Sequence, residues 1–341
     1  MMDRTYQLCF ISCLRLHRKY FSIGNALINL AFRSLIRNFA PWMKDISILI
    51  PTYNGICQTL VQALHQQAEA LPISYEIIVA DDGSTQLSTI LTNRAINQIS
   101  HCRYVERPEN TGRAAIRNFL ASQAQYPWLL FIDSDMEVCR ADYLRQYATS
   151  EGEAIVYGGV VIGPLQSGNL RSMYEKASEQ GHTPECRRQS PYHDFHTANF
   201  LVRRDLMQQH PFDLRFRRYG YEDVLFGKQM QLHHIPILHI DNPLSFEHFE
   251  SNADFISKTE EGLRTLCQFR QELQDYSRLL HFFGTPASFW LTTPCSLLYR
   301  LLGSLMRRNL TSTHPSLQLF KLYKLSYLAT LLKTKQTTSS I

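Results

Sequence analysis

The chain has 341 residues, of which 44% are hydrophobic and 19% charged, and its formal net charge is +5. This composition excludes a disordered chain, and 15 Gly and 14 Pro exclude a collagen-like or low-complexity one. The sequence lacks an uninterrupted apolar run of about 18 residues, which argues against a conventional transmembrane helix.

The charge is distributed unevenly along the chain. Residues 1–45 hold seven Lys and Arg against two Asp, and residues 285–341 hold seven against none, so the stretch between them is net acidic. This distribution disfavours nucleic-acid binding and predicts a body that holds a cation and ends that contact an anionic surface. Eight scattered cysteines without a CxxC spacing indicate the reduced thiols of a cytosolic protein.

Residues 46–135 alternate between predicted strands and helices. Strands are expected at 46–51, 75–80, 102–107 and 128–132, and helices at 57–70, 86–99 and 112–124, the last with Asn110 or Thr111 as its N-cap. Strands that are apolar throughout and separated by helices predict an α/β fold with a mostly parallel sheet covered on both faces. Ligands of such sheets bind beyond the carboxyl ends of the strands.

The remainder of the chain is less regular. Strand-like pieces occupy 154–162, 198–203 and 235–240, and a helix is expected to start near residue 221. Apolar positions at helical spacing predict one long amphipathic helix over 254–283. Beyond residue 285, Phe, Trp, Tyr and Leu are interleaved with Arg and Lys.

Two carboxylates follow the strand predicted at 128–132. Asp133 and Asp135 lie two residues apart, so both could approach one hard cation at the turn that leaves the strand. Mg²⁺ and Mn²⁺ favour carboxylate oxygens and commonly complete their shell with phosphate. A DxD tripeptide is common and is not by itself evidence of a site. This one directly follows five apolar residues, and acids are not needed for stability at the end of such a strand, which favours a functional role. The chain contains no GxGxxG after the first strand and no GxxxxGK[ST], HExxH or GxSxG sequence.

Two further acidic groups stand at predicted element ends. Asp81-Asp82-Gly83-Ser84 ends the second strand, where it suits a turn and helix N-cap and also a carboxylate that binds a nucleobase or ribose. Glu222-Asp223 opens the helix near 221, and acids at that position are stabilised by the helix dipole alone. The pair therefore indicates a functional site only if the other motifs are accepted as well.

Taken together, the motifs resemble those of the family 2 glycosyltransferases of GT-A fold. They cover about residues 45–250 in the order Pro51-Thr52-Tyr53-Asn54, Asp81-Asp82-Gly83-Ser84, Asn110-Thr111-Gly112-Arg113 with Arg117-Asn118, Asp133-Ser134-Asp135 and Gly220-Tyr221-Glu222-Asp223. Each motif alone is weak evidence for this family, but five motifs in the family's order and spacing are specific for it.

The resemblance implies a Rossmann-like nucleotide half, residues 45–135, joined to an acceptor half, residues 136–250. An amphipathic helix at 251–284 and a basic apolar tail at 285–341 would follow. The family transfers a sugar from a nucleotide diphosphate donor, usually UDP, with inversion at the anomeric carbon. Such an enzyme would build a cell-surface polysaccharide or a lipid-linked glycan from the cytoplasmic face of the inner membrane.

The resemblance also assigns roles to residues of this chain. Donor binding falls to Pro51, Thr52, Tyr53, Asn54, Asp81, Asp82, Asn110, Arg113, Arg117 and Asp133. Asp135, with Asp133, would hold Mn²⁺ or Mg²⁺, and His239 or His248 is the candidate for a further metal ligand, although a single His in such a segment is more often structural. Asp223 would be the general base, and Glu222 beside it would orient the acceptor.

Both ends of the chain leave alternatives open. Residues 1–44 are expected to be an upstream extension or a mis-assigned start, so that a chain starting at Met43 folds and stays active, or else an amphipathic membrane-surface segment. Residues 286–332 predict helices that either pack with a solvated basic face or dock on anionic lipid. Two other functions remain: a nucleotidyltransferase, which needs the metal but not the Glu222-Asp223 base, and a catalytically silent nucleotide-binding scaffold.

Overall fold

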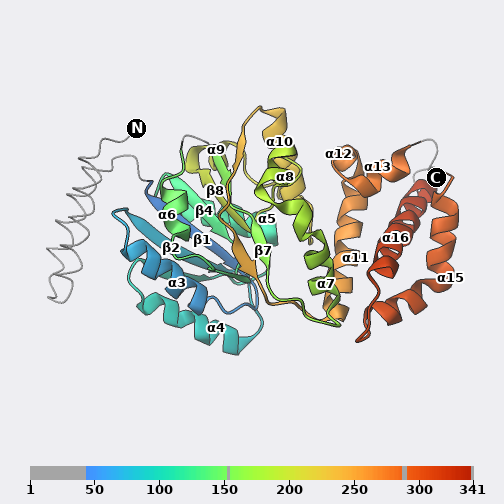
Figure 1. Cartoon of the computed structure of the whole chain (residues 1–341), viewed down its shortest axis with the longest axis horizontal. Coiled ribbons are helices and arrows are strands. Elements are labelled where there is room, and N and C mark those ends of the chain that lie inside the picture. The colour runs from blue at the N-terminus through green and yellow to red at the C-terminus, as the bar shows by residue number, and fades with distance from the viewer. Residues whose placement is uncertain (1–43, 152–153, 286–289, 339–341) are drawn as a thin grey trace.

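The computed structural model describes residues 44–151, 154–285 and 290–338 (Figure 1). The expectations for the N-terminal extension, including a start at Met43, lie outside the described residues. Within the described ranges, no helix is both long enough and apolar enough to span a membrane. The six cysteines found there carry free thiols.

A seven-stranded sheet in the order β3-β2-β1-β4-β8-β6-β9 forms the centre of the described structure. Its strands are β1 (Ile46–Thr52), β2 (Tyr75–Asp81), β3 (Cys102–Glu106), β4 (Trp128–Ile132), β6 (Ile155–Tyr157), β8 (Asn199–Arg203) and β9 (Ile237–His239). β1 pairs in parallel with β2 and β4, β2 with β3, and β6 with β9, whereas β8 runs antiparallel to both β4 and β6. The predicted mostly parallel sheet is therefore confirmed, with one reversed strand inserted into it.

The helices of the nucleotide half begin and end close to their predicted positions. They are α3 (Gln58–Glu69), α4 (Leu87–Arg94), which continues as a 3₁₀ turn over Ala95–Gln98, and α5 (Arg113–Gln123). The N-cap of α5 is Gly112 and not Asn110 or Thr111. Gly112 adopts φ +92°, and a Cβ there would stand 2.7 Å from the Arg217 carbonyl oxygen, so this position requires glycine.

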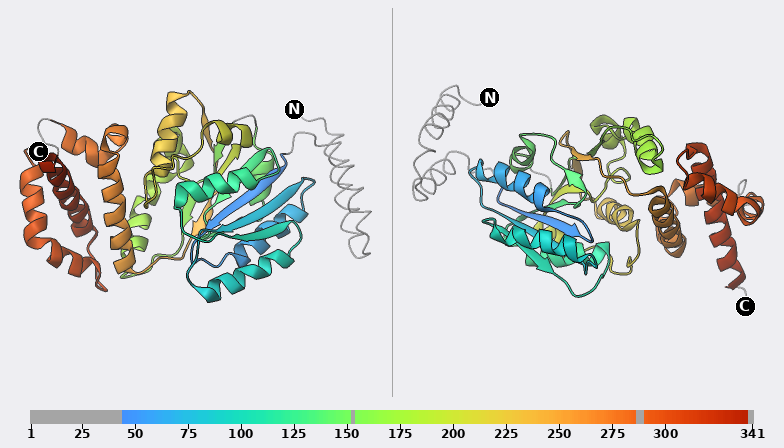
Figure 2. Two further views of the ribbon diagram at one scale, coloured as in Figure 1. Left: turned by 180° about the vertical axis from the view of Figure 1, so that it is seen from behind. Right: turned by 90° about the horizontal axis from the view of Figure 1, so that it is seen from below.

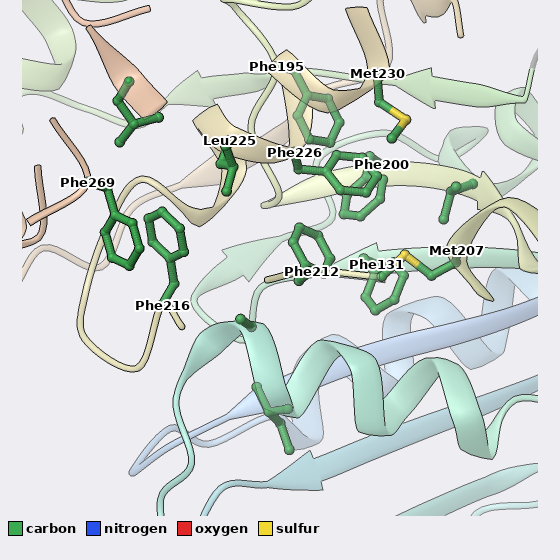
Figure 3. Packing of buried hydrophobic residues seen from close by; sticks show 14 of the residues in the cluster. Phe131, Phe195, Phe200, Met207, Phe212, Phe216, Leu225, Phe226, Met230 and Phe269 are labelled. Carbon is green, nitrogen blue, oxygen red and sulfur yellow. The ribbon is translucent and has the colours of Figure 1, made fainter. Parts of the chain in front are cut away.

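Side chains alternate between two cores on the two faces of the sheet. In β4, Leu130 and Ile132 face a core shared with α3 and α6 (Tyr143–Ala148), while Leu129 and Phe131 face the opposite one. That second core lies beneath α5, α9 (Arg204–Gln209) and α10 (Glu222–Leu232) and is rich in phenylalanine (Figure 3). The Phe131 and Phe200 rings stack there with centroids 4.9 Å apart. Burial on both faces explains why the central strands β1, β4 and β8 are largely apolar.

A small three-stranded sheet lies beside the main one and was not predicted. It consists of β5 (Met136–Glu137), β10 (Leu244–Phe246) and β7 (Val160–Ile162), in that order. The strand predicted over 154–162 is divided between the two sheets at Gly158 and Gly159. Gly159 adopts φ +92° beside the Arg187 guanidinium, which a Cβ would meet at 2.6 Å. The segment after β7 forms α7 (Leu170–Ser178), a 3₁₀ turn (Glu179–His182) and α8 (Pro184–Gln189).

The prediction of one helix over 254–283 is wrong, because this segment forms three helices. They are α11 (Asn252–Gln268), α12 (Arg270–Leu273) and α13 (Arg278–Gly284). The chain turns at Phe269, whose ring stacks on Phe216 with centroids 3.9 Å apart, and Ser277 caps α13 through its side chain. Leu273, Leu280 and Phe283 all reach the same core, so the apolar spacing persists across the breaks and imitates one continuous helix.

The predicted C-terminal helices are present as α15 (Thr292–Leu310) and α16 (Leu317–Thr338). They pack on each other and on α11 at the end of the molecule away from the sheet (Figures 1 and 2). A third core joins them to α7 and α11, with Leu170, Ile256, Leu310, Phe320 and Tyr323 fully buried or nearly so. The tail is therefore a packed part of the fold.

Candidate active site

A hollow of about 400 Å³ opens at the carboxyl end of β4 and the beginning of β8. Asp133 and Asp135 line it from the nucleotide half, and Asp223 lines it from the first turn of α10. The remaining walls come from α7, the loop before β8 and β10. The predicted metal acids and the predicted base thus share one concave space.

The Asp133–Asp135 pair carries incompletely compensated negative charge. Asp133 Oδ1 accepts a hydrogen bond from Arg117 Nη2 at 2.6 Å, whereas Asp135 Oδ1 is buried and has no hydrogen-bond partner in the described structure. Burial, and then the neighbouring charge of Asp133, raise the pKa of Asp135 despite the opposing charge of Arg113. An unpartnered carboxylate oxygen beside a second carboxylate is a donor set that fits Mn²⁺ or Mg²⁺.

The predicted histidine ligand is wrong for both candidates. His239 is buried in β9 with its Nε2 atom 2.9 Å from the Pro191 carbonyl oxygen, and burial lowers its pKa to about 4. His248 lies on the surface 2.7 Å from Glu137 Oε1. Neither lines the hollow, and the described residues contain no group of three His, Cys, Asp or Glu side chains that could hold a metal ion.

The chain enters α10 through a turn that separates the two acids of the Glu222-Asp223 pair. Gly220 and Tyr221 both adopt positive φ, at +93° and +70°, and the helix begins at Glu222. Asp223 then lines the hollow, whereas the Glu222 side chain is only 3% exposed and does not. The structure therefore does not bring Glu222 to the space where an acceptor would lie.

Glu222 instead belongs to a buried charge bridge. Arg117, 1% exposed, donates from Nη2 to Asp133 and from Nη1 to Glu222 Oε1 at 3.3 Å. Burial and the charge of Asp223 raise the pKa of Glu222, against the attraction of Arg113 and Arg117. The guanidinium thus ties the end of β4 to the start of α10, the two elements that carry the hollow's acids.

Sequence reasoning missed His196, which faces Asp223. Its Nδ1 atom lies 3.2 Å from Asp223 Oδ2, and both side chains line the hollow. Burial opposes the ionisation of Asp223, but the hydrogen bond and charge of His196, together with the Val224 amide and the charge of Arg117, lower the pKa of Asp223. Burial also disfavours charge on His196, yet the hydrogen bond to Asp223 raises its pKa. The pair is therefore stabilised as imidazolium and carboxylate.

Apart from Arg113, the other predicted donor residues do not line this hollow. They lie at the carboxyl ends of β1 and β2, except for Arg117 within α5 and Asn110 in the loop between β3 and α5. Asp82 is buried and accepts hydrogen bonds from Arg107, Thr111 and the Gly112 amide, so it holds the loop that leads into α5. Asp81 accepts from the Ser84 amide at 2.7 Å and from the Tyr104 hydroxyl.

The neighbouring motif residues shape the same edge. Asn54 Oδ1 accepts from the Thr85 and Gln86 amides, and Asn110 Oδ1 accepts from the Gly112 amide. Pro51 and Thr52 belong to β1, while Tyr53 is 49% exposed beyond its end. Of the predicted donor residues in this half, Tyr53 presents the largest exposed apolar surface, which is suited to stacking on a base.

Arg113 lines the hollow from the first turn of α5. Its guanidinium lies over the Tyr219 ring, 4.7 Å from the centroid, and 3.9 Å from Asp133 Oδ2. Its side chain is 44% exposed. It therefore offers a positive charge beside the two acids in a position that a bound anion can reach.

Comparison with known proteins identifies the segment that carries this geometry. A family model described as glycosyl transferase family 2 matches residues 47–210. This segment is a family 2 glycosyl transferase domain. It contains β1 through β8 and the Asp133–Asp135 pair, while Asp223 follows shortly after it.

Curated relatives share parts of the same region. The chain is 36% identical over 96 residues to an uncharacterized glycosyltransferase of Haemophilus influenzae, covering 27% of this chain and 37% of that protein. It is 32% identical over 139 residues to a poly(ribitol-phosphate) beta-glucosyltransferase of Bacillus spizizenii, covering 39% of this chain and 22% of that protein. The matches thus span well under half the length of these relatives.

A solved structure shows the likeness of the whole fold. The mannosyltransferase PcManGT from Pyrobaculum calidifontis, solved in complex with GDP-Man and Mn²⁺, is similar with a TM-score of 0.50 at 14% identity. The similarity covers 98% of this chain and 100% of that one. At this identity it shows the fold alone, and it confirms the predicted GT-A glycosyltransferase fold.

Proposed function

We propose that this protein is an inverting glycosyltransferase that moves a sugar from a nucleotide diphosphate, of the UDP type, to an acceptor hydroxyl. The observation that carries the proposal is that Asp133, Asp135 and Asp223 all face one hollow of about 400 Å³. Inverting transfer needs charge stabilisation at the leaving group and a base for the incoming hydroxyl. These acids supply groups for both within one space.

Asp133 and Asp135 would hold a divalent cation, which when bound supplies electrophilic stabilisation of the departing diphosphate. Arg113 adds a positive charge on the same side. Asp223 takes the proton of the acceptor hydroxyl as that oxygen attacks, and a single carboxylate suffices because inversion requires no covalent intermediate. His196 keeps Asp223 ionised and fixes one of its oxygens.

The acceptor in this proposal is a cell-surface glycan or a lipid-linked precursor at the cytoplasmic face of the membrane, with the protein attached peripherally. The polymer-glycosylating relative of Bacillus spizizenii supports this acceptor class. The nucleotide half would comprise residues 45–135 and the acceptor half residues 136–250. β1, β2 and the loops after them would bind the nucleotide, with Tyr53 against the base.

The test is release of UDP from a panel of UDP-sugars with Mn²⁺ and an acceptor extract, comparing the wild type with Asp223→Asn. We expect donor binding to survive in the variant while transfer falls about a hundredfold or more, as loss of a general base requires. Asp205→Asn is the matched control, since Asp205 pairs with Arg203 in an ion pair half-exposed to solvent. Unchanged turnover in Asp223→Asn would remove this residue from the role.

Two further measurements separate the alternatives: pyrophosphate release from a nucleoside triphosphate with a sugar phosphate, and nucleotide binding without UDP release. A nucleotidyltransferase would release pyrophosphate from a nucleoside triphosphate and a sugar phosphate, and it would not depend on Asp223. A silent scaffold would bind the nucleotide without releasing UDP. The placement of Asp223 opposite the metal acids, with His196 holding it ionised, favours the glycosyltransferase over both.

A further inference from the structure

Exposed apolar side chains are concentrated on helix α15 and just before it. Six large apolar side chains that are exposed to solvent lie on it or just before it: Trp290, Leu291, Leu297, Leu301, Leu302 and Leu305. Leu297, Leu301 and Leu305 are 53%, 70% and 63% exposed and follow one another at four-residue spacing. They therefore form a row along one side of the helix. We call this set the α15 leucine face.

The opposite side of α15 is fully occupied. Ser296, Gly303, Met306 and Leu310 are buried there, and Met306 and Leu310 belong to the third core. The helix lies at the outer edge of the molecule in both the front and the rear view (Figures 1 and 2). The buried side of α15 is therefore already packed against the fold, and the leucine face is the other side of the helix. Its leucine row, Leu297, Leu301 and Leu305, is a second apolar surface that the described fold leaves exposed.

The charge around the leucine face indicates what covers it. Arg300 flanks the leucine row and Arg308 follows it in the last turn, and neither forms an ion pair with any residue that the structure describes. The sequence contains no acidic residue after Asp275. An exposed leucine row with a tryptophan at one end and unpaired arginines beside it is typical of a helix that lies in the interface of an anionic membrane.

A protein partner fits this face less well. A stable protein–protein interface buries about 800 Å² on each side around a well-packed centre that is depleted of charge. The leucine face is instead one helix wide, with cations at its margin. A bilayer accepts such a narrow row, since each leucine enters the acyl boundary while the long arginine side chains reach the headgroups.

We propose that the α15 leucine face docks this protein on an anionic lipid surface. The inference deepens the proposed function and rests on it for its purpose. Helix α7 lines the hollow through Tyr174 and Glu175 and shares the third core with α15. Lys324 of α16 also donates a hydrogen bond to the Tyr174 hydroxyl at 3.1 Å. A docked α15 thus holds the hollow at a fixed position relative to the bilayer, where a lipid-linked acceptor can reach it.

The experiment is flotation of the full chain with vesicles of phosphatidylcholine alone or phosphatidylcholine mixed with phosphatidylglycerol. We expect the wild type to float with the mixed vesicles at low salt and less at high salt. The triple variant Leu297→Ser, Leu301→Ser, Leu305→Ser should lose binding by about tenfold or more, because it removes the apolar insertion. All three residues are exposed, so the fold does not depend on them.

The matched control is Leu87→Ser with Leu91→Ser on α4, two leucines that are 65% and 53% exposed at the same spacing but on the nucleotide half. This variant should float like the wild type. A triple variant that floats as well as the wild type overturns the inference and would place binding elsewhere in the chain. A wild type that does not bind vesicles but is dimeric in solution, with a monomeric triple variant, would identify the face as a contact between copies.

The result of the vesicle experiment does not depend on the catalytic proposal. UDP release with a water-soluble acceptor should be equal in the wild type and the triple variant, because the leucine face does not line the hollow. If Asp223→Asn remains fully active while the triple variant loses vesicle binding, the proposed chemistry fails and the docking surface stands. If Asp223→Asn loses activity while the triple variant still binds vesicles, the proposed chemistry stands and the docking surface is refuted.

Discussion

His196 Nδ1 lies 3.2 Å from Asp223 Oδ2, which joins the loop before β8 to the first turn of α10 inside the hollow. The contact lowers the pKa of a carboxyl group that burial alone would raise. A base in this position must stay ionised to accept a proton, and His196 extends the pH range over which it does so.

The first prediction concerns this pH range. In His196→Ala, Asp223 loses the hydrogen bond and the positive charge while burial remains, so its pKa rises. The acidic limb of the kcat–pH profile should then move to higher pH, so that kcat falls most at the acidic end of the profile. The control is His193→Ala, since His193 stacks on Tyr276 with centroids 4.2 Å apart and does not line the hollow. An acidic limb at the wild-type position would show that His196 does not act on the base.

The second prediction concerns the cation. In Asp135→Asn, one buried negative charge next to Asp133 is removed, so the metal-free protein should unfold at a higher temperature than the wild type. The same change should weaken Mn²⁺-dependent binding of UDP by about tenfold or more, because a cation loses a charged ligand. Thermal unfolding and calorimetric titration with and without Mn²⁺ measure the two effects.

The control for the second prediction is Asp142→Asn. Asp142 is paired with Arg140 at the surface, so it should change neither quantity appreciably. Wild-type affinity of Asp135→Asn for UDP in Mn²⁺ would refute the assignment of Asp135 as a metal ligand. A lower unfolding temperature would contradict the inference that the charge of Asp135 is poorly compensated.

The third prediction concerns the buried bridge. Arg117→Met leaves Asp133 and Glu222 without their shared cation, and breaking a buried pair in this way costs about 3–5 kcal/mol of unfolding free energy. Adding Glu222→Gln should recover part of that loss, since it removes one of the two uncompensated acids. Arg203→Met, which breaks a half-exposed pair, should cost about 1 kcal/mol or less. Urea unfolding of the wild type and the three variants measures these free energies. Equal losses of unfolding free energy in Arg117→Met and Arg203→Met would contradict a stabilising role for the buried bridge.

The nucleotide half could be predicted from the sequence because its signals are local. β1, β2 and β4 are largely apolar runs, whereas the short edge strand β3 is more mixed, and each intervening helix has its own apolar spacing and boundary. Asp133 and Asp135 were found for the same reason, as they stand directly after such a strand. The N-cap of α5 was missed because Gly112 is dictated by the distant Arg217 carbonyl.

The acceptor half could not be predicted in the same detail because long-range contacts define it. β5 and β10 contain two and three residues, too few to show a period, whereas β7 and β9 lie within the strand-like pieces predicted at 154–162 and 235–240. His196 was missed because its role depends on the antiparallel direction of β8, which the sequence pattern does not disclose. His239 was predicted as a possible ligand from the resemblance to the family, without a spacing in this sequence to support it, and in the fold its Nε2 atom instead lies 2.9 Å from the Pro191 carbonyl oxygen.

The reversed direction of β8 has a further consequence for engineering. Ile132 pairs with Asn199, so the residues preceding β8 meet the end of β4, and the Asp133 amide donates to the Ala198 carbonyl. The residues that follow β8, from Arg203 onward, emerge at the opposite edge beside Trp128. A fluorophore attached at the exposed Gln208 or Gln209 would consequently leave substrate access untouched. By contrast, inserting one residue between His196 and Ala198 would move His196 away from Asp223.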